Sequence, residues 1–175
     1  MNLKIALAAL GFVSAASMAL ADVGHEHGQV TGKPGQASEV DRQIELSMDE
    51  MDFDPDEIEV APGETIRFVV SNDGNAVHEF NIGTPEAWDA HSSEMLAMMR
   101  EGVMTARKIR HEKMQEKGMM HDDPSSVLLE PGQTAELIWT FPEDSSMLGF
   151  ACNVPGHRAG GMVGDFVTAG EETTS

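Results

Sequence analysis

The sequence predicts an all-β fold: a β-sandwich of about seven strands, interrupted once by a helical segment rich in methionine and histidine. Apolar and polar residues alternate at period two from Asp41 to Ile82 and again after Pro124, a pattern typical of strands with one face in water. Pro-Gly and Asn-Asp-Gly-Asn turns separate these runs at the spacing of a sandwich. Between the two runs, residues 85–123 consist mostly of helix-forming residues.

The first 21 residues predict a secretory signal peptide. Lys4 supplies a positive charge, Ile5 to Ala16 is almost entirely apolar, and Ala19-Leu20-Ala21 provides small residues before the cleavage point. The alternative, a membrane anchor, needs about 20 consecutive apolar residues and different flanks. No later segment is apolar enough to span a membrane, so we expect an exported protein without a membrane contact after cleavage.

The rest of the chain divides into a tail, one domain and a short C-terminal tail. Residues 22–40 are rich in glycine and polar residues and predict a flexible tail, in which His25 and His27 are solvated. We expect one sandwich domain over residues 41–170, interrupted by the insertion at 85–123, and a C-terminal tail at 171–175. The β-rich runs behind this prediction are centred on Ile44–Leu46, Ile58–Val60, Thr65–Ser71, Val77–Ile82, Val127–Leu129, Ala135–Phe141, Leu148–Cys152 and Gly164–Thr168.

Charge and cysteine content narrow the class of partner. Thirty acidic against 11 basic residues give a formal charge of −19, which argues against a nucleic-acid partner and favours cations or basic proteins. The single cysteine excludes an internal disulfide. Because exported proteins usually pair their cysteines, we expect something to occupy this thiolate.

The loop from Cys152 to Met162 contains most of the candidate metal ligands. Four residues, which include a Pro-Gly turn, separate Cys152 from His157, and four more separate His157 from Met162. A lone cysteine or methionine is more often a buried apolar residue, but thiolate, imidazole and thioether together form a soft donor set that selects copper, and zinc rarely recruits methionine. His78, at the start of a predicted strand, is the candidate second histidine.

These motifs resemble those of a bacterial cupredoxin. The resemblance covers roughly residues 42–83 and 127–169, and it is most specific in the loop from Cys152 to Met162. It is carried by Phe53-Asp54-Pro55, Ile58, Val60, Pro62-Gly63-Glu64-Thr65, Val77-His78-Glu79-Phe80-Asn81-Ile82, Pro131-Gly132 and that loop. With its Met- and His-bearing insertion, the chain is similar to the periplasmic copper-tolerance cupredoxins of the CopI type.

The resemblance implies a Greek-key, cupredoxin-like sandwich with one type 1 copper, in a monomeric periplasmic protein. The implied ligands are His78, Cys152, His157 and a weak axial Met162. Many blue copper proteins have Asn or Ser after the first histidine, where the side chain braces the cysteine loop, whereas this chain has Glu79. The sequence therefore leaves the surroundings of the ligands, and with them the reduction potential and colour, open.

The insertion offers a second set of soft donors. On a helix, His91, Met95, Met98 and Met99 would share one face, which is also the pattern of ordinary helix packing. Few Leu, Ile, Val or Phe accompany them, and thioethers and imidazoles are Cu(I) donors, so both interpretations stay open. The candidate secondary Cu(I) site comprises His91, Met95, Met98, Met99, His111, Met114, Met119, Met120 and His121.

Three functions fit these observations. The first is copper tolerance, by binding and handling Cu(I) and Cu(II), which the methionine-rich insertion favours. The second is a soluble electron shuttle to a basic redox partner, which the small residues around His157 favour. The third is a cuprous oxidase, but the chain's only His-x-His, His25-Glu26-His27, lies in the tail. We therefore expect a copper protein that is not an enzyme.

Overall fold

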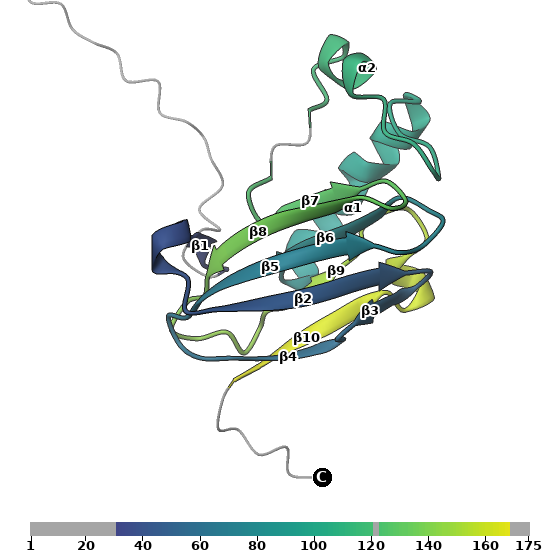
Figure 1. Ribbon diagram of the computed structural model, residues 1–175. Helices are drawn as coiled ribbons and strands as arrows, with labels where there is room; N and C mark the ends of the chain where they lie inside the picture. Colours follow the sequence, from purple (N-terminus) through teal and green to yellow (C-terminus); the bar gives the residue numbers. More distant parts are fainter. Residues whose placement is uncertain (1–30, 121–122, 169–175) are drawn as a thin grey trace, which may run out of the picture.

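Two five-stranded sheets face each other across one core in the computed structural model, which describes residues 31–120 and 123–168 (Figure 1). The predicted signal peptide, His25, His27, His121 and the C-terminal tail lie outside the described residues. The first sheet has the order β1 (Lys33–Pro34), β8 (Thr134–Thr140), β5 (Thr65–Asn72), β2 (Arg42–Asp49) and β3 (Asp52–Asp54). The second has the order β4 (Glu57–Val60), β10 (Val163–Thr168), β9 (Gly149–Ala151), β6 (His78–Gly83) and β7 (Ser126–Leu129).

The period-two pattern of the sequence sets the register of both sheets. Ile66, Phe68 and Val70 of β5 are fully buried between the sheets, while β5 pairs with β2 in parallel and with β8 antiparallel. Phe80 of β6 packs against Phe68, with ring centroids 5.2 Å apart, and against Phe150, at 5.3 Å. Burying each such side chain contributes about 1.5 to 3 kcal/mol, so this aromatic layer is a main source of stability.

Strand β6 is buried on both faces, unlike a typical sandwich strand. All six of its residues are buried because the insertion covers its outer face. There Glu79 and Asn81 contact His91 and Asp123, and Trp88 packs near Gly83. Since β6 begins at His78, the insertion covers the strand that carries a candidate ligand.

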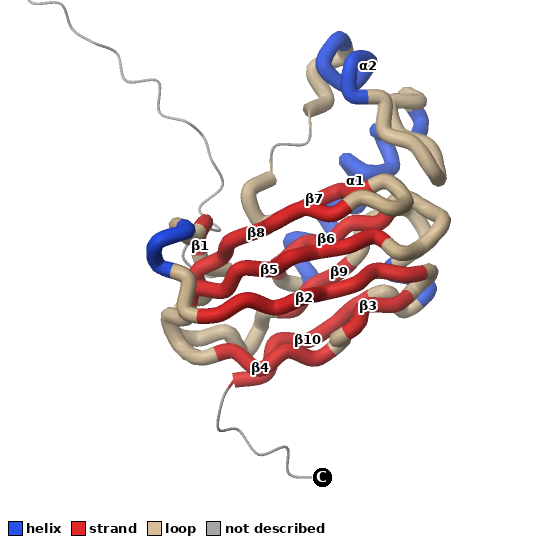
Figure 2. Tube along the Cα trace, in the orientation of Figure 1, coloured by secondary structure: helices blue, strands red, loops and turns tan. Residues whose placement is uncertain are grey.

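The insertion is partly helical, with α1 (Pro85–Arg100) and α2 (His111–Glu116) joined by turns, and both helices lie outside the two sheets (Figure 2). Thr84 caps α1 through its side chain and Pro85 occupies the first turn, a favourable start for a helix. Hydrogen bonds attach the α1–α2 connection to the sandwich: Val77 N–H donates to the Ala106 carbonyl (2.7 Å), and Glu130 accepts from Ile109 N–H (Oε1, 2.7 Å) and from Lys108 Nζ (Oε2, 3.1 Å). Among the described residues, no helix is long and apolar enough to cross a membrane.

Residues 31–40 differ from the flexible tail that the sequence predicts. Lys33 and Pro34 form β1 against the edge of β8, and the short helix η1 (Ala37–Glu39) follows. Trp139 Nε1 donates to the Thr31 carbonyl at 2.8 Å. The edge of β8 and the buried indole N–H both need partners, and this segment supplies them although its own sequence has no apolar period.

Candidate metal centre

Four elements bring the candidate ligands to one end of the sandwich. His78 is the first residue of β6, and Cys152 directly follows β9, which pairs antiparallel with β6. His157 precedes the short helix η2 (Arg158–Gly160), and Met162 directly precedes β10. Antiparallel pairing places the start of β6 and the end of β9 at the same end, so residues 74 positions apart meet.

The donor atoms of His78, Cys152 and His157 surround a common point. The Cys152 Sγ atom lies 3.3 Å from His157 Nδ1 and 4.0 Å from His78 Nδ1, and the two Nδ1 atoms are 3.2 Å apart. All three residues are buried, and they are the only group of three or more His, Cys, Asp or Glu side chains among the described residues that is arranged to hold a metal ion.

Backbone hydrogen bonds shape the loop that carries the other ligands. His157 N–H donates to the Val154 carbonyl (2.9 Å), Met162 N–H to the His157 carbonyl (3.1 Å) and Cys152 N–H to the Met162 carbonyl (3.2 Å). Gly156 and Gly161 adopt left-handed backbone conformations, with φ of 95° and 104°, which favour glycine. Met162, the axial ligand that the resemblance implies, is fully buried in this loop.

Burial sets the protonation of the metal-free ligands. It raises the pKa of the Cys152 thiol to about 12, an effect that the Glu79 N–H to Sγ hydrogen bond (3.4 Å) only partly offsets. Burial also lowers the pKa of His78 and of His157, the latter further through repulsion from His78. At neutral pH the imidazoles are therefore ready to bind a metal, and the thiol must lose its proton when the metal enters.

These residues fit copper. Metal bonds of about 2.0 to 2.3 Å to nitrogen and sulfur separate trigonal donors by about 3.5 to 4.0 Å, close to the three distances here. A trigonal His₂Cys set with a weak axial Met is the donor set of blue-copper sites. His78, Cys152 and His157 would hold the ion, with Met162 beside them, and copper would supply reversible one-electron chemistry.

Glu79, the departure in the motif, lies at the centre of a buried network. Its Oε2 accepts hydrogen bonds from the backbone N–H (3.1 Å) and side-chain Nδ2 (3.0 Å) of Asn153, the residue after Cys152. Its Oε1 accepts from Ser126 Oγ (2.9 Å) and lies 2.9 Å from His91 Nε2. Glu79 thus braces the cysteine loop, the role that Asn or Ser has in many blue copper proteins. The sequence marked position 79, but nothing in it pointed to Asn153 or Ser126.

The structure separates the predicted insertion donors into groups. Met95, Met98 and Met114 belong to the hydrophobic core, and Met99 and Met119 pack against it. His91 is engaged with Glu79. Most of these side chains are therefore accounted for by packing or hydrogen bonding, which is the alternative that the sequence left open.

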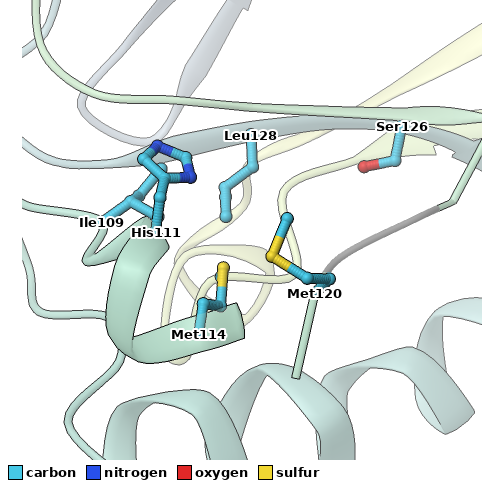
Figure 3. Close-up of a pocket in the computed structure, with 6 residues that line it drawn as sticks. All are labelled: Ile109, His111, Met114, Met120, Ser126 and Leu128. Atoms are coloured by element: carbon cyan, nitrogen blue, oxygen red, sulfur yellow. The ribbon is translucent and has the colours of Figure 1, made fainter. Parts of the chain in front are cut away.

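His111, Met114 and Met120 line one hollow of about 170 Å³, together with Ile109, Ser126 and Leu128. In Figure 3 the thioethers of Met114 and Met120 point toward each other across this hollow, and the His111 ring stands at its rim. Met120 is 55% exposed, so the hollow is open to solvent on the Met120 side.

Comparison with known proteins agrees with the fold and with copper binding. Residues 40–169 match the model of the family described as copper binding proteins, plastocyanin/azurin family. The chain is 43% identical over 173 residues to the copper-resistant cuproprotein CopI of Pseudomonas aeruginosa, covering 93% of each chain. It is 37% identical over 165 residues to the protein of the same name from Rubrivivax gelatinosus, covering 87% of this chain and 88% of that one.

Solved structures with the same fold include two auracyanins. Reduced auracyanin from Roseiflexus castenholzii superposes with a TM-score of 0.54 at 22% identity, covering 74% of this chain and 98% of that one. Auracyanin B superposes with a TM-score of 0.57 at 15% identity, covering 78% of this chain and 95% of that one. The chain belongs to the plastocyanin/azurin family of copper-binding proteins. Within that family it is a cupredoxin of the CopI type.

Proposed function

We propose that this cupredoxin serves copper tolerance by binding one type 1 copper and cycling it between Cu(I) and Cu(II). The observation that carries the proposal is the buried set of His78, Cys152 and His157, whose three donor atoms lie 3.2 to 4.0 Å apart. Two relatives that match most of the chain are named copper-resistant cuproproteins, which supports tolerance as the physiological role.

We assign the protein to the periplasm, as a monomer that binds copper without catalysing a reaction. The signal-like residues 1–21 support this location. Edman sequencing of the protein from a periplasmic extract tests it: the proposal expects Asp22 as the first residue. Oxygen consumption by the copper-loaded protein with Cu(I) as substrate tests the absence of oxidase activity.

Electron transfer to a basic partner is a second candidate function. His157 lies just below a surface of small, exposed residues that includes Gly156, Ala159 and Gly160, which would let a partner approach the ligand's edge. The charge of −19 would attract a cationic protein. Copper tolerance affects growth in the presence of copper, whereas a pure electron shuttle would not, so growth assays with added copper can separate the two functions.

The decisive experiment compares cells that lack this protein and carry either the wild-type or the Cys152→Ser gene. We expect the Cys152→Ser cells to tolerate less copper at equal protein level in the periplasm, because the thiolate ligand is gone. Met147→Leu, at an exposed position outside the site, is the control and should restore tolerance fully. Equal tolerance of the Cys152→Ser and wild-type cells would contradict the tolerance role and leave the electron shuttle.

A further inference from the structure

We propose that the hollow between His111, Met114 and Met120 is a second metal site, specific for Cu(I). This inference rests on the proposed copper handling, and it selects three of the eight candidate donors that lie within the described residues; the ninth, His121, lies outside them. Met95, Met98 and Met114 are core residues, but Met114 also lines this hollow, which is open to solvent. His91 is held by Glu79, and Met99 and Met119 pack against the core.

The chemistry of the hollow matches Cu(I) rather than a hard cation. Two thioethers and one imidazole are neutral, soft donors, which suit Cu(I) and disfavour Mg²⁺ or Ca²⁺. The other lining residues are Ile109 and Leu128, which are apolar, and Ser126. Among the described residues, no carboxylate lines the hollow, so a singly charged soft ion is favoured over a divalent one.

The geometry lets the site form without unfolding the insertion. Met114 is anchored in α2 with its thioether directed into the hollow, and His111 is one turn earlier on the same helix (Figure 3). Met120 is exposed and unbranched, so its thioether can move onto an ion held by the other two. Residues at i and i+3 of a helix face the same side, so the pair on α2 is fixed before the ion arrives.

The test uses full-length protein with ¹³C-labelled methionine ε-methyl groups and anaerobic Cu(I). The first equivalent fills the site at Cys152; the second should shift the methyl signals of Met114 and Met120 while those of the exposed Met51 and Met147 stay in place. His111→Asn and Met120→Leu should each weaken the second binding event by roughly tenfold or more, since even residues outside the ligand shell cost 10- to 100-fold. Met147→Leu is the matched control.

Two results would overturn the site. A second equivalent that leaves the Met114 and Met120 signals unchanged places the ion elsewhere, and a Met120→Leu protein with wild-type Cu(I) affinity shows that the thioether is not a ligand. Because the methyl signals report on the hollow directly, a failure of copper to bind at Cys152 would be recognised separately and would not be confused with either result.

A different set of contacts points to a positioning role for Glu79 and His91. We propose that the Glu79 carboxylate couples helix α1 to the copper loop, so that His91 helps to set the ligand geometry without touching the metal. Glu79 is fully buried, and its two oxygens contact different elements: Asn153 in the loop on one side, Ser126 of β7 and His91 of α1 on the other. A buried carboxylate is costly unless it is paired, and here it is paired across three elements.

If this coupling exists, substitution of either Glu79 or His91 should change the geometry of the copper site. Asn153 is bonded to Glu79 through both its backbone and its side chain, and the preceding residue is the ligand Cys152. In Glu79→Gln one of the two oxygens becomes an NH₂ group, which cannot accept a hydrogen bond, so the loop loses part of its support. In His91→Gln the loop contacts remain and only the connection to α1 is altered.

The test measures the visible absorption spectrum and the reduction potential of copper-loaded variants. Glu79→Gln should shift both, His91→Gln should shift both by less, and the double variant should match Glu79→Gln alone, because the two residues act through one connection. Glu86→Gln, on the exposed face of α1, is the control and should match the wild type. A His91→Gln protein with unchanged spectrum and potential, or shifts that add in the double variant, would overturn the coupling.

Discussion

The end of the sandwich that holds the candidate copper ligands, here called the copper end, and the insertion contain the same kinds of donor, yet the fold uses them differently. At the copper end, His78, Cys152 and His157 come from separate elements and face one point with their donor atoms. In the insertion, Met95 and Met98 lie on one helix and pack into the core. The comparison teaches that methionines along one face of α1 serve packing, whereas donors brought together from distant segments can form a site.

The largest effect is expected at the copper end. Cys152→Ser should abolish the intense visible charge-transfer absorption of the Cu(II) protein, because this band requires the thiolate. Met162→Leu is the matched control: it removes only the weak axial donor, so an intense band should persist, shifted in position. Absorption spectra of protein titrated with Cu(II) measure both. A Cu(II)-loaded wild-type protein without a visible band, with Cys152 still open to alkylation, would falsify the type 1 assignment.

Substitutions of Met95 in α1 test whether this residue packs in the core or binds copper. Met95→Ala should lower the free energy of unfolding by about 2 to 5 kcal/mol, because it leaves a cavity in the core. Met95→Leu preserves volume and should cost less than about 1.5 kcal/mol. Denaturant unfolding of the metal-free proteins measures both. A loss of one Cu(I) equivalent in Met95→Leu would show that this thioether binds copper after all.

The histidines of the two regions should also contribute to the pH dependence of folding stability with opposite sign. The pKa of His78 and His157 is lowered in the fold, so the unfolded chain binds more protons there and stability falls as the pH drops below about 6.5. For His91, burial lowers the pKa but the Glu79 hydrogen bond and charge more than offset it, so the pKa is raised. Its contribution is present below about 6.5 and is lost as the pH rises through the folded-state pKa.

Unfolding of the metal-free protein between pH 5 and 8 checks these signs. His91→Gln should make the loss of stability in acid steeper than in the wild type, because a group that favours the folded state at low pH is gone. His157→Gln should make that loss shallower. Identical pH dependence in all three proteins would contradict both assignments.

The smallest effect concerns the surface above His157. Ala159→Asp should slow electron exchange with a small anionic oxidant by about tenfold at low ionic strength, through local charge repulsion, and leave the absorption spectrum nearly unchanged. Stopped-flow rates measure this, with Val163→Asp, at an exposed position in β10, as the control. Rates that fall equally in both variants would indicate a general charge effect instead of contact at His157.

Much of the metal centre was predictable because its donors are rare residues in a compact pattern. One cysteine, followed at equal spacing by His157 and Met162, with a Pro-Gly turn before the histidine, points to copper from chemistry alone. The remaining ligand, His78, was placed by the period-two pattern of its strand. The insertion was less predictable, because methionines at helical spacing look the same whether they pack or bind.

The sequence by itself determined the β-sandwich, the interruption at 85–123 and the four candidate ligands, since local periodicity and donor chemistry are properties of short segments. Only the tertiary structure decided that residues 31–40 complete the edge of β8, that Glu79 meets Asn153, Ser126 and His91, and that His111, Met114 and Met120 share a hollow. These contacts join segments far apart in the chain, and they depend on which buried polar atoms need partners once the sheets and the insertion have packed.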